Sequence, residues 1–299
     1  MKSLYILCNA GLANRLHAIA GAKYIAQQTG RNLKVWWPVN HHLGAQFKRL
    51  FKNQDLDFVK QDEIQALLDN ENRVKVYNCG YNVLKTEVPE CYEVMGDDAE
   101  EIVAIKTYYT PRFKHLHEAS IAPHVVRFLR ELSPVDEVLD LMQPYLGLWK
   151  RGCPIGLHIR YGDYAPGQPG QWDKDNVALY ARSGVNSFKA AADQILAQHP
   201  VATFFVTSIN PAIELELVMY LNETNVGFQP KTNAGRHTVL GMREALADLI
   251  LLSRCNFIVG SDYSQFTQAA AELGCIPVVR AGNPKYEEQL SKLIETRLS

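Results

Sequence analysis

Strand-like and helix-like segments alternate along almost the whole chain, and this alternation limits the folds that the sequence can adopt. In the first half, short apolar runs predict strands at Leu4–Asn9, Leu33–Trp37, Asp57–Val59, Val74–Tyr77 and Ile102–Thr107. The segments between them predict helices at Asn14–Gln28, Ala45–Phe51, Glu63–Leu68 and His117–Leu132. This order favours parallel sheets with helices on both faces. We therefore expect an α/β protein.

The second half of the chain repeats the alternation more regularly. Strands are expected at Ile155–Arg160, Thr203–Thr207, Val226–Gln229, Phe257–Gly260 and Ile276–Val279. Helices are expected at Val185–Gln198, Pro211–Leu221, Leu240–Leu252, Ser264–Leu273 and Pro284–Leu298. The length of 299 residues is enough for two domains.

A break in the pattern near residue 150 gives the expected domain boundary. Ser133 and Pro134 are typical of a helix start, and we expect that helix to run to about Trp149. A Gly-Cys-Pro segment then ends it. We expect an N-terminal α/β domain over residues 1–150 and a C-terminal one over 151–283. A final helix over 284–299 should pack back on the body.

The composition excludes several classes of protein. The formal net charge is −1, with 47% hydrophobic and 21% charged residues, so a dedicated nucleic-acid binder is not expected. The first residues lack the pattern of a signal peptide, and no segment is long and apolar enough to span a bilayer. The six cysteines are scattered without a CxxC pair, so we expect no zinc site and a reduced, cytoplasmic protein.

The segment PIGLHIRYGD is the most informative stretch of the chain. Its apolar residues predict a buried strand, which runs directly into His158, Arg160 and Asp163. In α/β sheets, chemistry gathers beyond the carboxyl ends of the strands. Arginine offers a planar set of donors suited to phosphate, and the carboxylate can take a proton or hold a hydroxyl. The alternative is a capped strand end with a surface ion pair.

Two small-residue turns also follow expected strands. Gly11, Asn14 and Arg15 lie where the first strand meets a helix, and Ser261 and Ser264 lie at a second such turn. Amide groups at a helix start can bind an anion. A plain tight turn and ordinary N-capping are the alternatives.

Asp248 lies in the middle of an otherwise apolar helix. A carboxylate in such a place is costly unless it is paired or bound. Pairing with Arg243 or Arg254 is one explanation, and a hydrogen bond to a nucleobase or ribose is the other.

In this order, the motifs resemble the GDP-fucose-dependent fucosyltransferases of the GT-B fold, the group of α1,2-, α1,6- and protein O-fucosyltransferases. They are Gly11–Asn14 (G-x-x-N), His158–Asp163 (H-x-R-x-x-D), Ala245–Leu249 (A-x-x-D-L) and Ser261–Phe266 (S-x-x-S-x-F). The resemblance implies two Rossmann-like α/β domains facing across a cleft. It also implies a metal-independent, inverting transfer of a sugar, with fucose from GDP-fucose expected, to a hydroxyl of a glycan or another acceptor.

The resemblance also implies roles for individual residues. Arg160 would hold the β-phosphate of GDP, and His158 and Asp248 would hold the guanosine. The remaining donor-binding residues would surround the diphosphate: Gly11, Asn14, Arg15, Ser261, Ser264, Gln265 and Phe266. The chain departs from the family pattern at Tyr161, where a second arginine is usual, and at Gln265, where a second serine is often found. These departures bear on the sugar more than on the diphosphate.

A long Gly- and Pro-rich segment follows Arg160, over residues 161–184. Loops of this length are usually functional or disordered, and its aromatic residues favour contact with the acceptor, through Tyr164, Trp172 and Asp173. Asp163 is the first candidate for the general base, with Asp173 and Asp175 as alternatives. No metal or other cofactor is expected. The competing interpretations are a nucleotide-sugar-binding protein without catalysis and a glycosyltransferase that uses another NDP-sugar, including a metal-dependent UDP-sugar enzyme.

Overall fold

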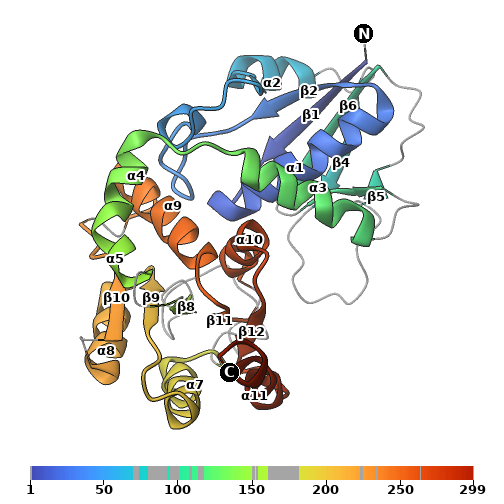
Figure 1. Cartoon of the computed structure of the whole chain (residues 1–299). Coiled ribbons are helices and arrows are strands. Elements are labelled where there is room, and N and C mark those ends of the chain that lie inside the picture. The colour runs from blue at the N-terminus through green and yellow to red at the C-terminus, as the bar shows by residue number, and fades with distance from the viewer. Residues whose placement is uncertain are drawn as a thin grey trace. The chain divides into compact units, whose positions relative to one another are not determined.

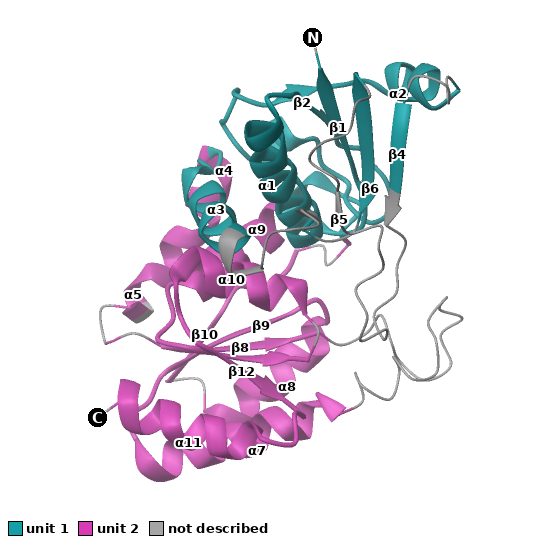
Figure 2. Cartoon of the chain, turned by 90° about the vertical axis from the view of Figure 1, so that its right-hand side faces the viewer, with its two compact units in different colours: residues 1–135, 236–242 teal, residues 136–235, 243–299 magenta. Residues whose placement is uncertain are grey.

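The computed structural model divides the chain into two compact α/β units (Figure 2). Unit 1 comprises residues 1–135 and 236–242, and unit 2 comprises residues 136–235 and 243–299. The structure describes residues 2–69, 74–79, 93–94, 101–107, 110–113, 118–149, 152, 154–160, 182–222, 225–232, 235–262 and 264–298.

The division between the units falls at Val135, earlier than the boundary expected near residue 150. Backbone hydrogen bonds explain the position, since Val135 N donates to Leu50 O at 3.0 Å and Lys52 N donates to Ser133 O at 2.8 Å. These bonds hold residues 133–135 against unit 1. The helix that follows, α4 (Asp136–Met142), belongs to unit 2.

Unit 1 is built on a parallel five-stranded sheet with the order β3-β2-β1-β6-β4. The strands are β1 (Ser3–Cys8), β2 (Asn32–Trp36), β3 (Asp57–Phe58), β4 (Val74–Cys79) and β6 (Ile102–Thr107). Ile64 of α2 (Gln61–Leu68) packs on one face of the sheet with Tyr5, Leu7, Val74 and Ala104. Helices α1 (Leu12–Thr29) and α3 (Glu118–Glu131) pack against each other and on the sheet (Figure 1).

Unit 2 has a second parallel five-stranded sheet, with the order β10-β9-β8-β11-β12. The strands are β8 (Ile155–Ile159), β9 (Phe204–Ser208), β10 (Val226–Phe228), β11 (Ile258–Ser261) and β12 (Val278–Ala281). In Figure 1, α9 (Val239–Ser253) and α10 (Gln265–Gly274) lie on one face, and α7 (Val185–Gln198), α8 (Pro211–Leu221) and α11 (Tyr286–Arg297) lie on the other. Leu290 and Ile294 of α11 are part of the unit 2 core, so the terminal helix packs as expected.

Most of the expected elements are present, and the exceptions have physical causes. The expected helix Ala45–Phe51 is wrong: only a 3₁₀ turn, η1 (Phe47–Arg49), forms, and Phe51 then pairs with Pro134 in an isolated bridge. The helix expected up to Trp149 is broken into α4, η4 (Gln143–Tyr145) and α5 (Leu146–Trp149). Pro144 lacks the N–H that a continuous helix needs. A short strand pair, β5 (Glu93–Val94) with β7 (Arg112–Phe113), was not expected.

Candidate functional site

The candidate site in unit 2 is centred on His158, near the carboxyl end of β8. The His158 side chain is buried, and its Nδ1 lies 2.7 Å from Thr267 Oγ1 and 3.5 Å from Ser264 Oγ. Its ring stacks on Phe266 with the centroids 4.9 Å apart. Gly260 is the neighbour of His158 in the sheet, and a Cβ at Gly260 would lie 2.4 Å from Thr267. Glycine at position 260 therefore lets α10 approach close enough to hold the histidine ring.

The His158 ring is neutral at ordinary pH. Burial lowers its pKa to about 3, and the positive charges of Arg160, Arg280 and Lys231 act in the same direction. A neutral imidazole can both donate and accept hydrogen bonds. The same observation shows that cations surround this strand end, which suits an anionic ligand.

Arg160 follows β8 directly and is positioned by the second turn. Its backbone N–H donates to Ser261 Oγ at 3.0 Å, and its side chain is half-buried. Ser264 is the N-cap of α10 and accepts a hydrogen bond from Thr267 N. Ser261 and Ser264 are both fully buried, and their hydroxyl oxygens accept these hydrogen bonds from the protein backbone. A ligand at this turn would instead meet Arg160 and the start of α10, where Gln265 and Phe266 are half-buried.

Arg280 braces the same turn and was not expected from the sequence. Its Nη1 donates to the carbonyl oxygens of Ser261 and Ser264 at 3.2 and 3.3 Å, and its Nη2 donates to Gln268 Oε1 at 2.9 Å. Burial lowers the pKa of Arg280. The one available sequence signal was an arginine inside the apolar strand β12, where it lies beside Gly260.

Asp248 is buried on α9, and of the two explanations considered for it, pairing with Arg243 or Arg254 is not observed. Its Oδ2 accepts a hydrogen bond from Thr207 Oγ1 at 2.5 Å and forms an ion pair with Lys231 Nζ at 2.9 Å. Arg243 instead pairs with Glu137 at 2.6 Å. The alternative of an Arg243 or Arg254 partner is wrong, because Lys231, on the loop after β10, takes that place. The predicted contact of Asp248 with a nucleoside stays a prediction.

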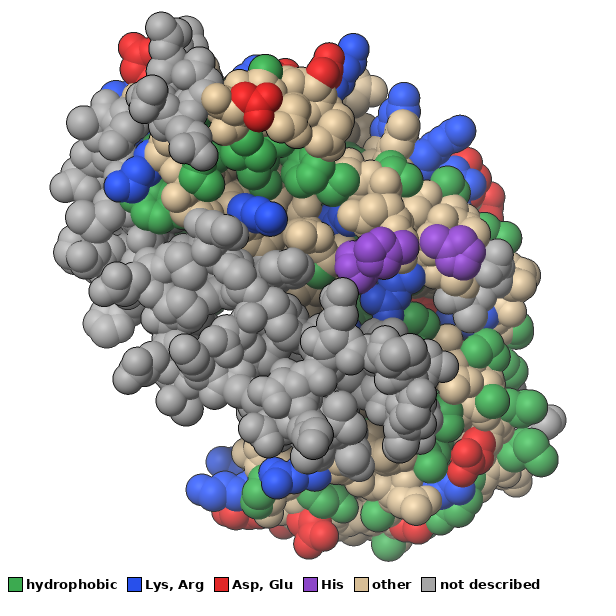
Figure 3. Space-filling view, turned by 180° about the vertical axis from the view of Figure 1, so that it is seen from behind, with side chains coloured by type: hydrophobic (Ala, Val, Ile, Leu, Met, Phe, Trp, Pro, Cys, Tyr) green, Lys and Arg blue, Asp and Glu red, His purple; other side chains and the backbone are tan. Residues whose placement is uncertain are grey.

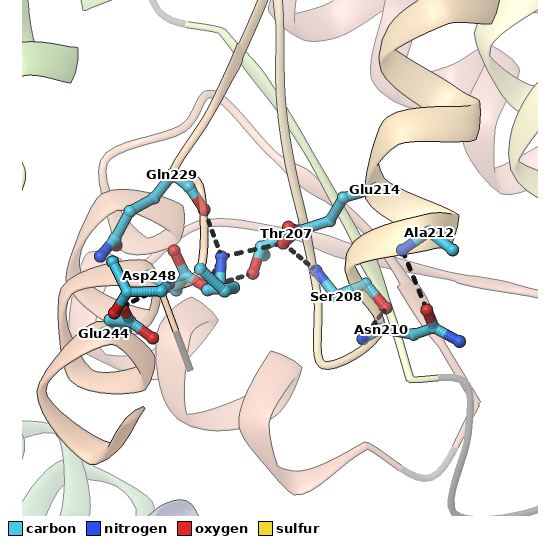
Figure 4. Close-up of polar contacts among 10 residues, drawn as sticks. Thr207, Ser208, Asn210, Ala212, Glu214, Gln229, Glu244 and Asp248 are labelled. Atoms are coloured by element: carbon cyan, nitrogen blue, oxygen red, sulfur yellow. Dashed lines mark hydrogen bonds and ion pairs between the residues drawn. The ribbon is translucent and has the colours of Figure 1, made fainter. Parts of the chain in front are cut away.

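Lys231 joins Asp248 to a second buried carboxylate (Figure 4). Its Nζ lies 2.9 Å from Glu214 Oε1 and donates to the backbone oxygen of Gln229 at 2.7 Å. Burial lowers the pKa of Lys231, but the two carboxylates outweigh this effect and raise it overall, so the lysine stays charged. Burial raises the pKa of Glu214 to about 7 and also raises that of Asp248. Two buried carboxyl groups and one lysine therefore meet at this end of the sheet.

The turn after β1, in unit 1, has a different character from the one expected. Gly11 begins α1, and a Cβ there would meet no atom within 4 Å. Asn14 is half-buried one turn away. The Arg15 side chain is 0% exposed and donates to Ala10 O, Pro38 O and Asn40 Oδ1. The expected contact between Arg15 and a diphosphate is therefore corrected to a structural role.

Several predicted residues lie outside the part of the chain that the structure describes. They are Tyr161, Asp163, Tyr164, Trp172, Asp173 and Asp175. Their proposed roles, as the general base of the reaction or as contacts to the acceptor, stay predictions.

Histidine side chains gather on one face of the molecule next to lysine or arginine side chains (Figure 3). The rings of His41 and His42 have centroids 3.8 Å apart. Among the residues that the structure describes, no group of three or more His, Cys, Asp or Glu side chains is placed to hold a metal ion.

Within the same residues, no helix has the length and apolar character needed to cross a membrane.

Known proteins resemble this chain in structure only. No protein-family model matches the sequence, and no characterised protein matches it by sequence. The α1,6-fucosyltransferase NodZ soaked with GDP-fucose matches with a TM-score of 0.59 and 16% identity, over 94% of this chain and 95% of that one. A NodZ structure from Bradyrhizobium gives 0.58 at 17% identity, over 94% of each chain.

Two further matches have the same fold. A mutant of FUT1 from Arabidopsis thaliana in complex with GDP gives a TM-score of 0.57 at 16% identity, over 95% of this chain and 71% of that one. POFUT1 in complex with GDP gives 0.55 at 11% identity, over 94% and 98%. These matches, together with the two parallel sheets, confirm the expected α/β fold of the GT-B type with two Rossmann-like domains.

Proposed function

We propose that unit 2 binds a GDP-sugar and that the protein is a metal-independent glycosyltransferase, with fucose as the first candidate sugar. The observation that carries this proposal is a row of register partners across the sheet: Thr207, His158, Gly260 and Arg280. Three strand spacings separate the ends of this row, about 14 Å in all. Asp248 and Glu214 lie near the Thr207 end, and Arg160 and Arg280 lie near the other.

This separation of charge matches the two ends of GDP. The diphosphate is an anion and suits the end with the arginines, where the start of α10 adds its positive dipole. A guanine base presents N–H donors and suits the acidic end, where Asp248 carries the predicted nucleoside contact. His158, neutral and central, can hydrogen-bond to the nucleoside between them.

In the proposed reaction, the acceptor hydroxyl attacks the anomeric carbon while the bond from that carbon to the β-phosphate oxygen breaks. Arg160 stabilises the negative charge that grows on the departing diphosphate, a contribution typically worth a factor of about 10²–10³ in rate. Asp163 is the proposed base that takes the hydroxyl proton, with Asp173 and Asp175 as alternatives. Tyr164, Trp172 and Asp173 are the proposed acceptor contacts.

Other features agree with this proposal. Solved structures of similar fold were determined with GDP-fucose or GDP, namely NodZ, FUT1 and POFUT1. The buried thiols of Cys8 and Cys255 are consistent with a cytoplasmic protein.

The proposal is tested by comparing GDP with GMP, which lacks the β-phosphate. The wild-type protein should bind GDP more tightly than GMP, and Arg160→Ala should remove most of that preference. Arg254→Ala, which removes an exposed arginine outside the row, is the matched control and should keep it. An Arg160→Ala variant with an unchanged GDP preference would reject the proposed role of Arg160.

Turnover then separates an enzyme from a binding protein. Release of GDP from GDP-fucose should depend on Arg160 and should be unaffected by a chelator. A protein that binds GDP-fucose but releases no GDP with any hydroxyl acceptor would instead be a nucleotide-sugar-binding protein.

A further inference from the structure

Four buried polar atoms near the acidic end of unit 2 have no hydrogen-bond partner among the described residues. They are Asp248 Oδ1, Glu244 Oε2, and both Nε2 and Oε1 of Gln229. Buried polar groups in native proteins are almost always paired, and leaving one unpaired costs about 1–3 kcal/mol. Four such atoms in one place therefore indicate a missing partner.

These atoms belong to one small region. Glu244 and Asp248 are four residues apart on α9, which places them on the same side of the helix. Gln229 lies in the loop after β10, two residues before Lys231. Figure 4 draws the three side chains close together. The other carboxylate oxygen of Glu244, Oε1, is paired: it accepts hydrogen bonds from Thr232 N and Thr232 Oγ1 at 2.8 and 2.5 Å.

A pocket adjoins two of the three side chains. Its volume is about 350 Å³, and its lining includes Gln229, Glu244 and Thr232. Tyr145, Pro144 and Pro230 supply flat apolar surfaces in the same pocket. A planar ring that enters it would stack on these surfaces, next to the two residues that carry three of the four unpaired atoms. Those atoms are themselves buried, so they reach the ring only when the Gln229 and Glu244 side chains turn toward it.

The set of unpaired atoms consists of three acceptors and one amide donor group. The Watson–Crick edge of guanine is its complement, since N1–H and the 2-amino group donate and O6 accepts. An ammonium group has no acceptor to offer to Gln229 Nε2. Adenine and uracil each have fewer donor hydrogens on that edge.

We propose that Gln229 and Glu244 are specificity-determining residues that, together with Asp248, select guanine among the nucleobases. Gln229 Nε2 donates to O6, and the carboxylates of Glu244 and Asp248 accept from N1–H and the 2-amino group. This inference rests on the proposed function, because it assigns the base of the same nucleotide. It goes beyond that function by naming two residues that no sequence motif indicated.

The first experiment measures the affinities of GDP, IDP and XDP by calorimetric titration. IDP lacks the 2-amino group, and XDP has an acceptor oxygen in its place. The wild-type protein should prefer GDP to IDP by about tenfold or more, as expected for a hydrogen bond to a charged group. Glu244→Gln should reduce this preference severalfold and raise the affinity for XDP, because an amide donor then faces the base. Glu216→Gln, on α8 and outside the pocket, should keep the wild-type order of affinities.

The second experiment separates ligand binding from folding. Gln229→Leu removes two unpaired buried atoms without removing a side-chain hydrogen bond that the structure shows, so the ligand-free variant should melt at the same temperature as the wild type or higher. Its affinity for GDP should nevertheless fall severalfold. A stable variant with weaker binding would support the proposal.

The outcomes distinguish this inference from the proposed function. A wild-type protein that binds no guanine nucleotide overturns both. A wild-type protein that binds GDP, with unchanged GDP, IDP and XDP affinities in both Glu244→Gln and Gln229→Leu, overturns the inference alone.

Discussion

Each unit buries a charged side chain close to the carboxyl edge of its parallel sheet, but the two are satisfied in different ways. In unit 1, Arg15 is fully buried, and its Nε, Nη1 and Nη2 all donate to protein oxygens. In unit 2, Asp248 is also buried, and Lys231 and Thr207 both bind its Oδ2, while Oδ1 has no partner among the described residues. A satisfied buried charge stabilises a turn, whereas an incompletely satisfied one points to a ligand.

The difference in hydrogen bonding also distinguishes Arg15 from Asp248, although the sequence predicted that both bind the nucleotide. The sequence presents a polar cluster after a strand in both units, and both resemble nucleotide contacts. Only the folded structure shows that the guanidinium of Arg15 already donates hydrogen bonds to Pro38 O and Asn40 Oδ1. The two units can therefore be compared by mutation, since changes in unit 1 should affect stability and changes in unit 2 should affect binding as well.

The largest effect is expected for Lys231→Met. This change leaves Glu214 and Asp248 buried without their cation, so the free energy of unfolding should fall by about 3–5 kcal/mol. Urea denaturation at neutral pH measures it. Adding Glu214→Gln should recover part of the loss, because a neutral amide then replaces one of the two carboxyl groups that have lost their cation. Equal stabilities of wild type and Lys231→Met would show that the cluster is not a true ion-pair network.

Arg15→Met should have a somewhat smaller effect and a different signature. The carbonyl oxygens of Ala10 and Pro38 would lose their donor, and the free energy of unfolding should fall by about 2–4 kcal/mol. At a temperature where the variant is folded, its affinity for GDP should equal that of the wild type. Weaker GDP binding without a loss of stability would restore Arg15 to the ligand site and remove the contrast between the units.

The pH dependence of stability tests the burial of His158. Its folded pKa of about 3 is below the unfolded value near 6.5, so its contribution is complete above pH 6.5 and is lost as the pH falls. Relative to His158→Gln, the wild-type free energy of unfolding should decrease by about 1.4 kcal/mol per pH unit between about pH 6 and pH 4. Denaturation of both proteins at matched pH measures the difference. Parallel pH profiles would mean that His158 titrates as an exposed histidine.

The smallest effect is expected on the surface of unit 2. Lys189 pairs with Glu216 at 2.8 Å, and both side chains are partly exposed. Lys189→Ala should therefore change the free energy of unfolding by less than about 1 kcal/mol. The same denaturation experiment sets this reference for the two buried clusters, and a larger loss would show that exposure is a poor guide to the value of an ion pair here.

The sequence predicted the elements of the fold better than the site. Strands such as β1 and β8 follow directly from short apolar runs, and Asn210 before Pro211 correctly predicted the start of α8. His158 and Arg160 could be found because they follow a recognisable strand within a few residues.

The remaining site residues could not be found in this way, because their positions depend on tertiary structure. Arg280 reaches the site through the register of β12 with β11, and Thr267 reaches it through the close approach of α10 to Gly260. Lys231 and Gln229 lie on the loop after β10, which carries no regular pattern, and Glu244 of α9 meets that loop only in the folded structure. For the same reason, the sequence could not show that Lys231, and neither Arg243 nor Arg254, pairs with Asp248.

The central claim is that unit 2 binds a guanine nucleoside diphosphate, and a calorimetric melting experiment with GDP and UDP tests it most directly. A ligand that binds only the folded protein stabilises it by about 2.7 kcal/mol when present at 100 times its dissociation constant. We predict a clear rise in melting temperature with GDP and GDP-fucose and a much smaller one with UDP. No rise with any guanine nucleotide, or an equal rise with UDP, would contradict the claim.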